Sequence, residues 1–450
     1  MGCRHYAIIP EGGTFLYQWR GNHTSIGDLL KISIIGLGYV GLPLSALLSK
    51  NHNVIGFDVD SLKVKAIVSG EFPIKEPGLD YHLSSALSSG RLEVTNDSSR
   101  ISNSQVKIIT VGTPYDVKTG FIDYSQLENS LNIVIPHLNT GDVVILKSTV
   151  PPGTTMGLVR EKIESYGLRV PDEIGLVFSP ERMIEGQAIM DFETLPKIIG
   201  SSDDRSFKIA KEIIGGLGGK VIRVSKPETA ETIKMVDNYS RYVFLGLVNE
   251  LAIACEKIGV DVLEVIRSAK EDYPRNAGLL VPGPGVGGSC LNKDPFIFSG
   301  LLRNTGVELE MVKSASRINS TMPGHVADLV RSYRKAGTVV ILGVAFKGDT
   351  DDTRFTPAFT IKEQLIAQGF VVRMTDPLVS GEGINSDVYA SCSGSDIVVL
   401  VTDHSEYRNL DLLMLKKVMN SSPLIIDTRG IVDRSMAISA GFEYHGLGRL

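Results

Sequence analysis

The stretch KISIIGLGYVG, residues 31–41, constrains the fold of this chain more than any other part of its sequence. A short apolar strand ends in Gly36 and Gly38, and Gly41 lies where the next residues predict a helix to begin. This G-x-G-x-x-G spacing permits a tight turn, close approach of the backbone to a pyrophosphate, and packing of the helix on the strand. The pattern is typical of a β-α-β unit that binds a dinucleotide.

An acidic residue at the end of the second strand narrows the choice of cofactor. That strand, HNVIGFD, ends in Asp58, twenty-two residues after Gly36. A carboxylate at this position can accept a hydrogen bond from a ribose 2′-hydroxyl and repels a 2′-phosphate, so NAD is favoured over NADP. The alternative is a plain β-α-β turn with an aspartate on its surface.

The strand and helix pattern occurs twice, and a chain of 450 residues exceeds one hydrophobic core. The predicted fold class is α/β, with two Rossmann-like doubly wound parallel-sheet domains joined by a long central helix and a helical middle domain. The expected divisions are a disordered or misassigned extension at 1–30, a cofactor domain at 31–224, a central helical and dimerisation domain at 225–335, and a second Rossmann-like domain at 336–450. Predicted strands are KISIIGLG, HNVIGFD, VKIITVGTP, DVVILKSTV and EIGLVFSPE in the first domain, and TVVILGVAFKGD, FVVRMTDP, DIVVLVTDH and PLIIDTRG in the second.

One helix of roughly thirty residues is predicted between the two domains. Ser225 and Glu228 have the spacing of a capping box, Pro227 suits the first turn, and Gly259 follows the end. The second half, YVFLGLVNELAIAC, is apolar on most faces, so we expect it to be buried on several sides. A helix that spans two domains and also forms a subunit interface would satisfy this pattern, which predicts at least a dimer.

Two further strands of the first domain end in polar residues. VGTP contains Thr113, and KSTVPPGTT contains Thr149. Ligands bind beyond the carboxyl ends of strands in such sheets, so both threonines are candidates for the nicotinamide and ribose edge. Ordinary loop capping by threonine is the alternative for each.

The stretch GVGGSCLNKDP, residues 285–295, places Cys290 in a flexible, polar setting near Lys293. A cysteine is needed when a nicotinamide enzyme oxidises an aldehyde onward, because the sulfur adds to the aldehyde and a thioester is then hydrolysed to an acid. Lys293 is expected to favour the thiolate, and the glycines to leave space for a sugar carbon. The alternative is a small apolar residue in a turn. Packing is the expected role of Cys255 and Cys392.

Polar residues on the long helix and after a strand could assist such a thiol. Lys234 and Asn238 are four residues apart and share a helix face, where they could hold an oxyanion or orient a water. SPERMIEG offers Glu181 and Glu185, either of which could be the general base for thioester hydrolysis. The alternative for the helix pair is a solvated surface.

Composition excludes several other classes of function. A net charge of −5 and an ordinary 22% of charged residues argue against nucleic-acid or anionic-membrane partners. No apolar run is long enough to span a bilayer. Four cysteines without paired spacing make neither a disulfide framework nor a zinc site, so no metal is expected and a cytoplasmic location is favoured.

Together these motifs resemble the UDP-glucose/GDP-mannose dehydrogenase family of nucleotide-sugar 6-dehydrogenases. The markers, from about residue 31 to 445, are GLGYVGLPLS, STVPPGTT, SPERMIEG, AETIKMVDN, GVGGSCLNKDP and GVAFKGDTDDTR. The resemblance implies NAD-dependent oxidation of a sugar C6 hydroxymethyl group to a carboxylate. It also implies that a UDP-sugar binds the second Rossmann-like domain.

The resemblance also implies roles for single residues. Cys290 is the implied nucleophile. The residues implied to hold the water or oxyanion are Lys234, Asn238 and Asp294. Glu185 is implied to serve thioester hydrolysis, and Thr149 to position a water. The implied cofactor-binding residues are Gly36, Gly38, Gly41, Asp58, Thr113, Thr149 and Arg354. The implied substrate-binding residues are Glu181, Lys234, Asn238, Arg275, Gly287 and Lys347, with Arg275 reaching the substrate of a neighbouring subunit.

Departures from the family pattern bear on the substrate. Asn292 and Ile184 stand where UDP-glucose enzymes usually carry proline and arginine, whereas Ser289 stands where the UDP-N-acetylhexosamine branch often has histidine. UDP-N-acetyl-D-mannosamine is the favoured substrate, and UDP-glucose is the close alternative. Two rival functions stay open at this point: a two-electron hydroxyacid dehydrogenase, and a sugar-nucleotide sensor without activity.

Overall fold

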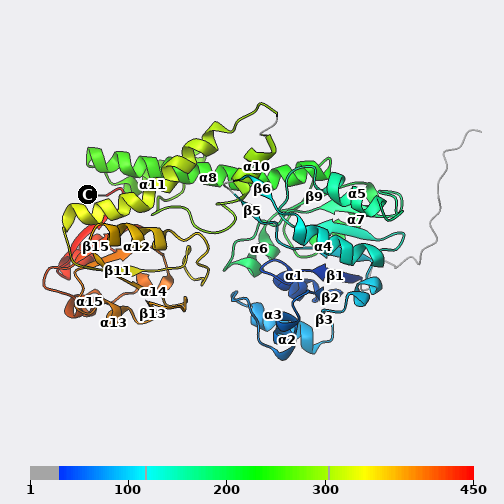
Figure 1. Cartoon of the computed structure of the whole chain (residues 1–450), viewed down its shortest axis with the longest axis horizontal. Coiled ribbons are helices and arrows are strands. Elements are labelled where there is room, and N and C mark those ends of the chain that lie inside the picture. The colour runs from blue at the N-terminus through cyan, green and yellow to red at the C-terminus, as the bar shows by residue number, and fades with distance from the viewer. Residues whose placement is uncertain (1–29, 117–118, 303–304, 450) are drawn as a thin grey trace, which may run out of the picture.

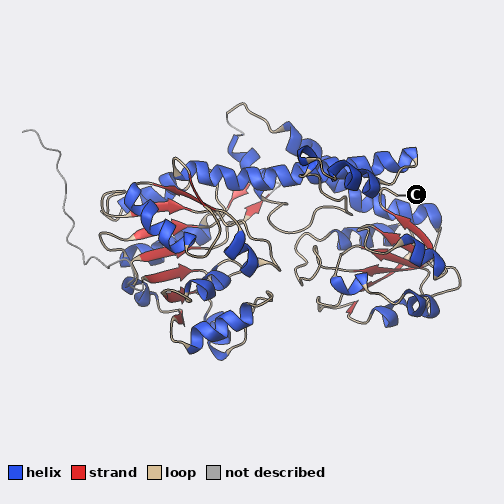
Figure 2. Cartoon of the chain, turned by 180° about the vertical axis from the view of Figure 1, so that it is seen from behind, coloured by secondary structure: helices blue, strands red, loops and turns tan. Residues whose placement is uncertain are grey.

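The chain forms two α/β lobes joined by a long helix (Figure 1). A computed structural model describes residues 30–116, 119–302 and 305–449. The predicted extension at 1–30 therefore lies almost entirely outside the described residues. Figure 2 shows each sheet between layers of helices, so the predicted α/β class with a helical middle region is confirmed.

The N-terminal lobe contains an eight-stranded sheet in the order β10-β9-β8-β7-β4-β1-β2-β3. Its strands are β1 (Lys31–Ile35), β2 (Asn53–Phe57), β3 (Leu92–Thr95), β4 (Val106–Ile109), β7 (Val143–Leu146), β8 (Gly175–Phe178), β9 (Lys197–Ser201) and β10 (Val221–Arg223). Neighbours from β3 to β8 are parallel, and the strand order reverses between β1 and β4. A crevice for ligands forms at such a reversal, beyond the carboxyl ends of the strands.

The parallel pattern does not continue to the edge of this sheet. β9 is antiparallel to β8, and β10 runs parallel to β9, so two strands run against the others. The five strands predicted for this lobe are present as β1, β2, β4, β7 and β8. Most of their residues are apolar and buried on both faces, which is the pattern of central parallel strands; Ser33 in β1 and Lys107 in β4 are buried polar residues.

Helices and short elements complete the N-terminal lobe. They are α1 (Gly41–Leu48), α2 (Ser61–Ser69), α3 (Leu79–Ser88), α4 (Ser125–Val134), α5 (Arg160–Glu164), α6 (Ala188–Thr194) and α7 (Asp204–Gly215), with 3-10 turns η1 (Ser98–Asn103) and η2 (Ile135–His137), a π-helical turn η3 (Thr155–Val159), and the hairpin of β5 (Tyr115–Asp116) and β6 (Phe121–Ile122). α6 lies on the side of this lobe that faces the C-terminal lobe (Figure 1).

The C-terminal lobe contains a six-stranded parallel sheet in the order β13-β12-β11-β14-β15-β16. The strands are β11 (Thr338–Leu342), β12 (Val371–Thr375), β13 (Ile384–Asn385), β14 (Ile397–Leu400), β15 (Leu424–Asp427) and β16 (Glu443–Gly446). Its helices are α12 (Pro357–Ala367), α13 (Val388–Cys392), α14 (Ser405–Arg408), α15 (Leu412–Val418) and α16 (Arg434–Ser439). All four strands predicted for this lobe are confirmed.

The predicted central helix is α8 (Pro227–Ile258), and α11 (Glu310–Tyr333) packs along it. The other elements between the lobes are α9 (Val262–Lys270), the 3-10 turn η4 (Pro274–Asn276) and α10 (Asp294–Leu302). Gly259 ends α8 in a left-handed conformation with φ of 74°, as predicted.

The predicted capping box at the start of α8 is wrong. Lys226, not Ser225, is the N-cap residue, and no side chain caps the helix. The residue before a proline is restricted to extended conformations, and Lys226 has φ of −162° and ψ of 162° ahead of Pro227. Ser225 is therefore one residue too early, and its hydroxyl contacts Thr229 instead of a backbone amide.

Other expectations from composition can be compared with the described residues. Cys255 and Cys392 are buried, as expected for packing residues. Within residues 30–116, 119–302 and 305–449, no helix is long and apolar enough to cross a membrane. The same residues contain no cluster of histidine, cysteine, aspartate and glutamate that could hold a metal ion.

Candidate active site

The glycine-rich turn after β1 has the shape that a pyrophosphate requires. Gly36 has φ of +95°, which few residues other than glycine adopt. A Cβ atom on Gly38 would meet nothing within 4 Å, so the turn is open on that side, where α1 presents the N–H groups of its first turn. A Cβ atom on Gly41 would lie 1.9 Å from the Gly36 carbonyl oxygen. The turn therefore fits the predicted dinucleotide.

We expect the second and third glycines to respond differently to alanine. Gly41→Ala should lower the free energy of unfolding by about 1–3 kcal/mol, because its Cβ would collide with backbone. Gly38→Ala should leave stability almost unchanged and weaken NAD binding, because its Cβ would occupy the open side of the turn. Thermal unfolding and a cofactor titration distinguish the two. Equal stability of both variants would contradict this account of the turn.

Asp58 at the end of β2 is oriented by its neighbours. Its Oδ2 accepts hydrogen bonds from Leu37 N at 2.8 Å and Lys63 Nζ at 2.8 Å, and its Oδ1 accepts one from Asp60 N at 3.0 Å. Burial raises the pKa of this carboxyl, but the hydrogen bonds outweigh it and hold the pKa below its usual range. The carboxylate is therefore charged, and its Oδ1 keeps a lone pair for a ribose hydroxyl.

The predicted threonines follow β4 and β7, at the carboxyl edge of the sheet. Thr113 is buried, and its Oγ1 has no hydrogen-bond partner among the described residues. Its carbonyl oxygen accepts from Lys293 Nζ at 2.9 Å, which ties this strand end to the segment that contains Cys290. Thr149 is half-buried in the loop after β7. The crevice of the N-terminal lobe and the cysteine segment are thus adjacent.

Cys290 lies in an exposed turn just before α10. Lys293 lowers the pKa of this thiol, as expected, but other contributions outweigh it. Burial of the sulfur by surrounding atoms and the charge of Asp294 raise the pKa of this thiol, and Lys234 and Lys293 lower it by less. The thiol is therefore protonated at neutral pH.

The glycines before Cys290 serve packing rather than open space for a sugar. A Cβ atom on Gly287 would lie 2.4 Å from Cβ of Phe346, and one on Gly288 would lie 2.8 Å from the ring of Phe346. Gly288 N also donates to the Arg354 carbonyl oxygen at 2.9 Å. These glycines let the loop after β11 in the C-terminal lobe contact the cysteine segment, so the expected role of Gly287 changes.

Three predicted polar residues meet beside the thiol. Lys234 is buried on α8, and Asn238, one turn later, donates from Nδ2 to Oδ2 of Asp294 at 2.5 Å. Asp294 is fully buried, and its Oδ1 accepts no hydrogen bond from a described residue, although Lys293 Nζ lies 3.8 Å away. The predicted helix pair is therefore part of an interior polar cluster and not a solvated surface.

The two candidate bases differ in how their oxygens are used. Glu181 Oε1 accepts from the amides of Arg182 and Met183, each at 2.8 Å, and its Oε2 lies 3.2 Å from Lys147 Nζ. Glu185 has only one engaged oxygen, because its Oε2 is buried without a hydrogen-bond partner among the described residues. Burial raises the pKa of Glu185 to about 7 against the lowering effect of Arg354. These differences make Glu185 the better candidate for a general base.

Loop residues of the C-terminal lobe reach Glu185. Lys347 Nζ donates to the Glu185 carbonyl oxygen at 2.7 Å, and Arg354 Nη2 lies 3.0 Å from its Oε1. The Arg354 guanidinium also pairs with Asp352 and lies 5.5 Å from the ring centre of Tyr39 in the glycine-rich turn. The structure thus places Lys347 and Arg354 between the lobes, in contact with Glu185.

Arg275 does not join this cluster within one chain. It is exposed on η4, with its guanidinium 5.9 Å from the ring of Tyr273. Two residues that the sequence reasoning missed lie near the site. Buried Lys147 holds Glu181, and half-buried Arg429 donates to the carbonyl oxygens of Val401 and Phe346. Both follow the ends of parallel strands, so the rule that identified the threonines could have found them.

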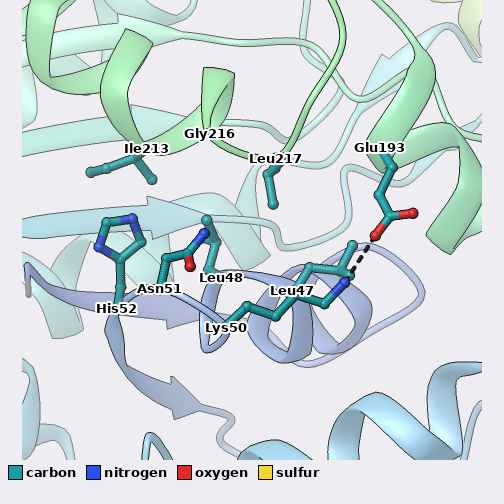
Figure 3. Close-up of a pocket in the computed structure, with 9 residues that line it drawn as sticks. All are labelled: Leu47, Leu48, Lys50, Asn51, His52, Glu193, Ile213, Gly216 and Leu217. Atoms are coloured by element: carbon teal, nitrogen blue, oxygen red, sulfur yellow. Dashed lines mark hydrogen bonds and ion pairs between the residues drawn. The ribbon is translucent and has the colours of Figure 1, made fainter.

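A separate cavity of about 190 Å³ lies elsewhere in the N-terminal lobe (Figure 3). It is bordered by the C-terminal ends of α1 and α7, and Lys50 pairs with Glu193 across it at 2.9 Å. The glycine-rich turn is at the opposite end of α1. This cavity is therefore no part of the candidate active site.

Family models match the chain in three consecutive segments. They are described as the NAD binding, central and UDP binding domains of the UDP-glucose/GDP-mannose dehydrogenase family, and they match residues 30–216, 228–321 and 340–434. Their order and spacing follow the N-terminal lobe, the helical middle region and the C-terminal lobe.

Individual relatives span nearly the whole chain. UDP-N-acetyl-D-mannosamine dehydrogenase from Pyrococcus horikoshii is 34% identical over 428 residues, covering 93% of this chain and 99% of the relative. UDP-glucose 6-dehydrogenase from Rickettsia conorii is 30% identical over 437 residues, with 93% and 99% covered. The solved P. horikoshii enzyme superposes with a TM-score of 0.85 at 33% identity, covering 93% of this chain and 99% of the other. UDP-glucose dehydrogenase from Pyrobaculum islandicum gives 0.83 at 26% identity, with 96% and 100% covered.

Proposed function

Because this chain belongs to the UDP-glucose/GDP-mannose dehydrogenase family and is an NAD-dependent UDP-sugar dehydrogenase, we propose that it oxidises the C6 hydroxymethyl group of its sugar to a carboxylate. The favoured substrate is UDP-N-acetyl-D-mannosamine. The observation that carries the proposal is the position of Cys290, in an exposed turn with its sulfur in the electrostatic field of Lys234, Lys293, Asp294 and Glu185.

NAD, when bound, accepts a hydride in each of the two oxidation steps. The turn from Gly36 to Gly41 and the amides that begin α1 would hold its pyrophosphate, and Asp58 would accept from a ribose hydroxyl. Thr113 and Thr149, at the ends of neighbouring strands, would line the side that faces Cys290. Arg354 would complete the cofactor site from the C-terminal lobe.

Cys290 forms and breaks the covalent bond to the sugar. After the alcohol has become an aldehyde, the thiol adds across its C=O bond, so that sulfur bonds to carbon and the proton reaches the oxygen. Loss of a second hydride and of that proton leaves a thioester. Lys234 and Asn238 would stabilise the oxygen on which negative charge develops, and Asp294, which accepts a hydrogen bond from Asn238, would hold the water. Stabilising a developing charge requires side chains that are oriented before the reaction begins, and burial holds these side chains in a fixed orientation.

Glu185 completes the reaction as the general base. A water attacks the thioester carbon, Glu185 accepts a proton from that water, the C–S bond breaks, and the released thiolate regains a proton. The buried, unengaged Oε2 and the pKa of about 7 suit a proton acceptor near neutral pH. Glu181 and Lys347 would contribute to the substrate side of the site, and Arg275 to that of a neighbouring subunit.

The choice of sugar is supported by the curated relatives. Enzymes from P. horikoshii and Methanocaldococcus jannaschii named for UDP-N-acetyl-D-mannosamine are 34% and 32% identical, against 30% for the R. conorii enzyme named for UDP-glucose. These differences are small, so UDP-glucose is the second candidate.

We expect two NADH per sugar consumed, and fastest turnover with UDP-N-acetyl-D-mannosamine, in a panel of UDP- and GDP-sugars assayed with purified protein. The ratio follows from two successive hydride transfers before the product leaves. One NADH per substrate would support the two-electron hydroxyacid dehydrogenase. Sugar binding without any NADH would support the sensor. Faster turnover of UDP-glucose than of UDP-N-acetyl-D-mannosamine would identify UDP-glucose as the preferred substrate and would agree with the same mechanism.

We also propose that the protein is at least a dimer through α8. Phe244, Leu247 and Leu251 are spaced along one face of the helix and keep 37–40% of their surface exposed, although the opposite face is buried. Light scattering should give at least twice the mass of one chain. A monomer at micromolar concentration would contradict the proposal.

Two further assignments accompany this function. The proposed divisions are a cofactor domain at 31–224, a central domain at 225–335 and a UDP-sugar domain at 336–450, which the positions of the three family matches support. The mechanism needs a reduced Cys290, so we propose that the reaction takes place in the cytoplasm, where thiols stay reduced.

A further inference from the structure

The segment that contains Glu185 is held at its backbone by side chains from three separate places in the chain. Ile184 N donates to Oδ2 of Asp191 at 2.8 Å, and the Glu185 carbonyl oxygen accepts from Lys347 Nζ at 2.7 Å. Gly186, with φ of +83°, then turns the chain into α6. The third anchor is a carboxylate more than one hundred residues earlier in the sequence.

That carboxylate belongs to Glu76, in the loop between α2 and α3. Its Oε1 accepts from Gly186 N at 2.6 Å, and its Oε2 accepts from Ala188 N at 3.1 Å. Only 6% of Glu76 is exposed, so water cannot readily replace these bonds. Both carboxylate oxygens of Glu76 therefore accept hydrogen bonds from backbone amides at the start of α6, directly after Glu185.

We infer that Glu76 is a positioning residue for Glu185, acting through the backbone of residues 185–188 to set where the proposed base meets the thioester. The inference rests on the proposed role of Glu185 as general base. The side-chain hydrogen bonds of Glu76 are with the segment itself. Burial lowers the pKa of Lys347 and the charge of Glu76 opposes this shift, so Glu76 also acts on the lysine that holds the Glu185 carbonyl oxygen. With saturating UDP-sugar, its expected effect is therefore on the hydrolytic step.

The geometry explains why a carboxylate is needed there. A glutamate offers two acceptor oxygens to two buried N–H groups, whereas glutamine offers one oxygen and an NH₂ group that would face a second donor. Glu76→Gln therefore leaves one amide without a partner and frees the turn at Gly186. A displacement of the base by about 1 Å can slow a step about 100-fold.

The test separates hydrolysis from the two hydride transfers. Enzyme is mixed with saturating NAD and UDP-sugar, and NADH is followed through the first turnover and into steady state. For Glu76→Gln we expect an NADH burst at the unmodified rate, a steady-state rate about 10–100-fold lower, and a thioester on Cys290 in the intact mass spectrum. The burst amplitude counts folded sites, so partial unfolding does not alter the comparison. Glu76→Asp, which keeps the charge but shortens the reach, gives a second variant with the same expected direction.

Asp203→Asn is the matched control. Asp203 caps α7 in the same lobe, with Oδ1 accepting from Ser206 N at 2.9 Å. Asparagine can still accept this hydrogen bond, so the variant should fold normally and leave burst and steady state unchanged. Equal steady-state rates in Glu76→Gln and the unmodified enzyme would overturn the inference, as would slowing of burst and steady state by the same factor.

Glu185→Gln, measured in parallel, separates the inference from the proposed function. Accumulated thioester in Glu185→Gln but not in either Glu76 variant would refute the positioning role alone. A normal hydrolytic rate in Glu185→Gln would refute the proposed base itself.

Discussion

Replacing Cys290 with serine is expected to reduce acid formation by at least about 1,000-fold while NAD still binds. A hydroxyl is a weaker nucleophile than a thiol towards the aldehyde, and an ester is hydrolysed more slowly than a thioester. The turn itself should survive, because its hydrogen bonds use the Cys290 carbonyl oxygen, which accepts from the amides of Lys293 and Asp294 at 3.2 and 2.9 Å. The glycine-rich turn around Gly36, where the cofactor binds, is unchanged.

Two measurements check this result. Chromatography of the products quantifies the uronate, and a cofactor titration quantifies NAD binding. Cys255→Ser is the matched control, because this cysteine is buried in α8 and takes no part in the proposed reaction. It should form acid at the normal rate per folded molecule. Uronate production by Cys290→Ser at the rate of the unmodified protein would contradict the covalent step.

The second large expected effect is the dependence of the rate of thioester hydrolysis on pH, through Glu185. Burial raises its pKa to about 7; the charge of Arg354 opposes this shift, and that of Asp352 adds to it. A base must be unprotonated to accept a proton, so hydrolysis should fall tenfold for each pH unit below about 7 and level off above it. Glu185→Gln cannot ionise. It should lose this acid limb and hydrolyse the thioester about 100- to 10,000-fold more slowly.

The measurement is the rate of acid release in a single turnover between pH 5 and 9, where hydride transfer is recorded separately by NADH absorbance. Asp352→Asn should move the acid limb of the profile to lower pH, because removing a nearby negative charge lowers the pKa of Glu185. An acid limb of the same midpoint in Glu185→Gln would assign the titration to another group.

Much of the fold follows from local patterns, because central parallel strands are continuous apolar runs. β7, β11 and β14 illustrate this rule, and each is buried along most of its length. Periodicity does not encode strand direction, so nothing in the short sequence of β9 indicates that it runs against β8. The start of α8 was misplaced for a local reason: Pro227 forces Lys226 into an extended conformation.

Some features of the candidate site could likewise be predicted from the sequence, and others could not. Cys290, Lys234 and Asn238 could be predicted because their residue types and spacing suggest chemistry. The net shift of the Cys290 pKa could not, since it depends on burial and on Asp294 as well as on the adjacent lysines. Glu76 was missed altogether, because its function arises from a contact across more than one hundred residues.

The central claim is that one sulfur captures the aldehyde formed in the same site, and intact mass spectrometry of Glu185→Gln tests it most directly. This variant, mixed with NAD and the UDP-sugar that the unmodified enzyme turns over, should gain the mass of one acyl group, with two NADH formed per site. Peptide mapping should place that group on Cys290, and hydroxylamine should remove it. Acid formation without any adduct, or an adduct on another residue, would contradict the account.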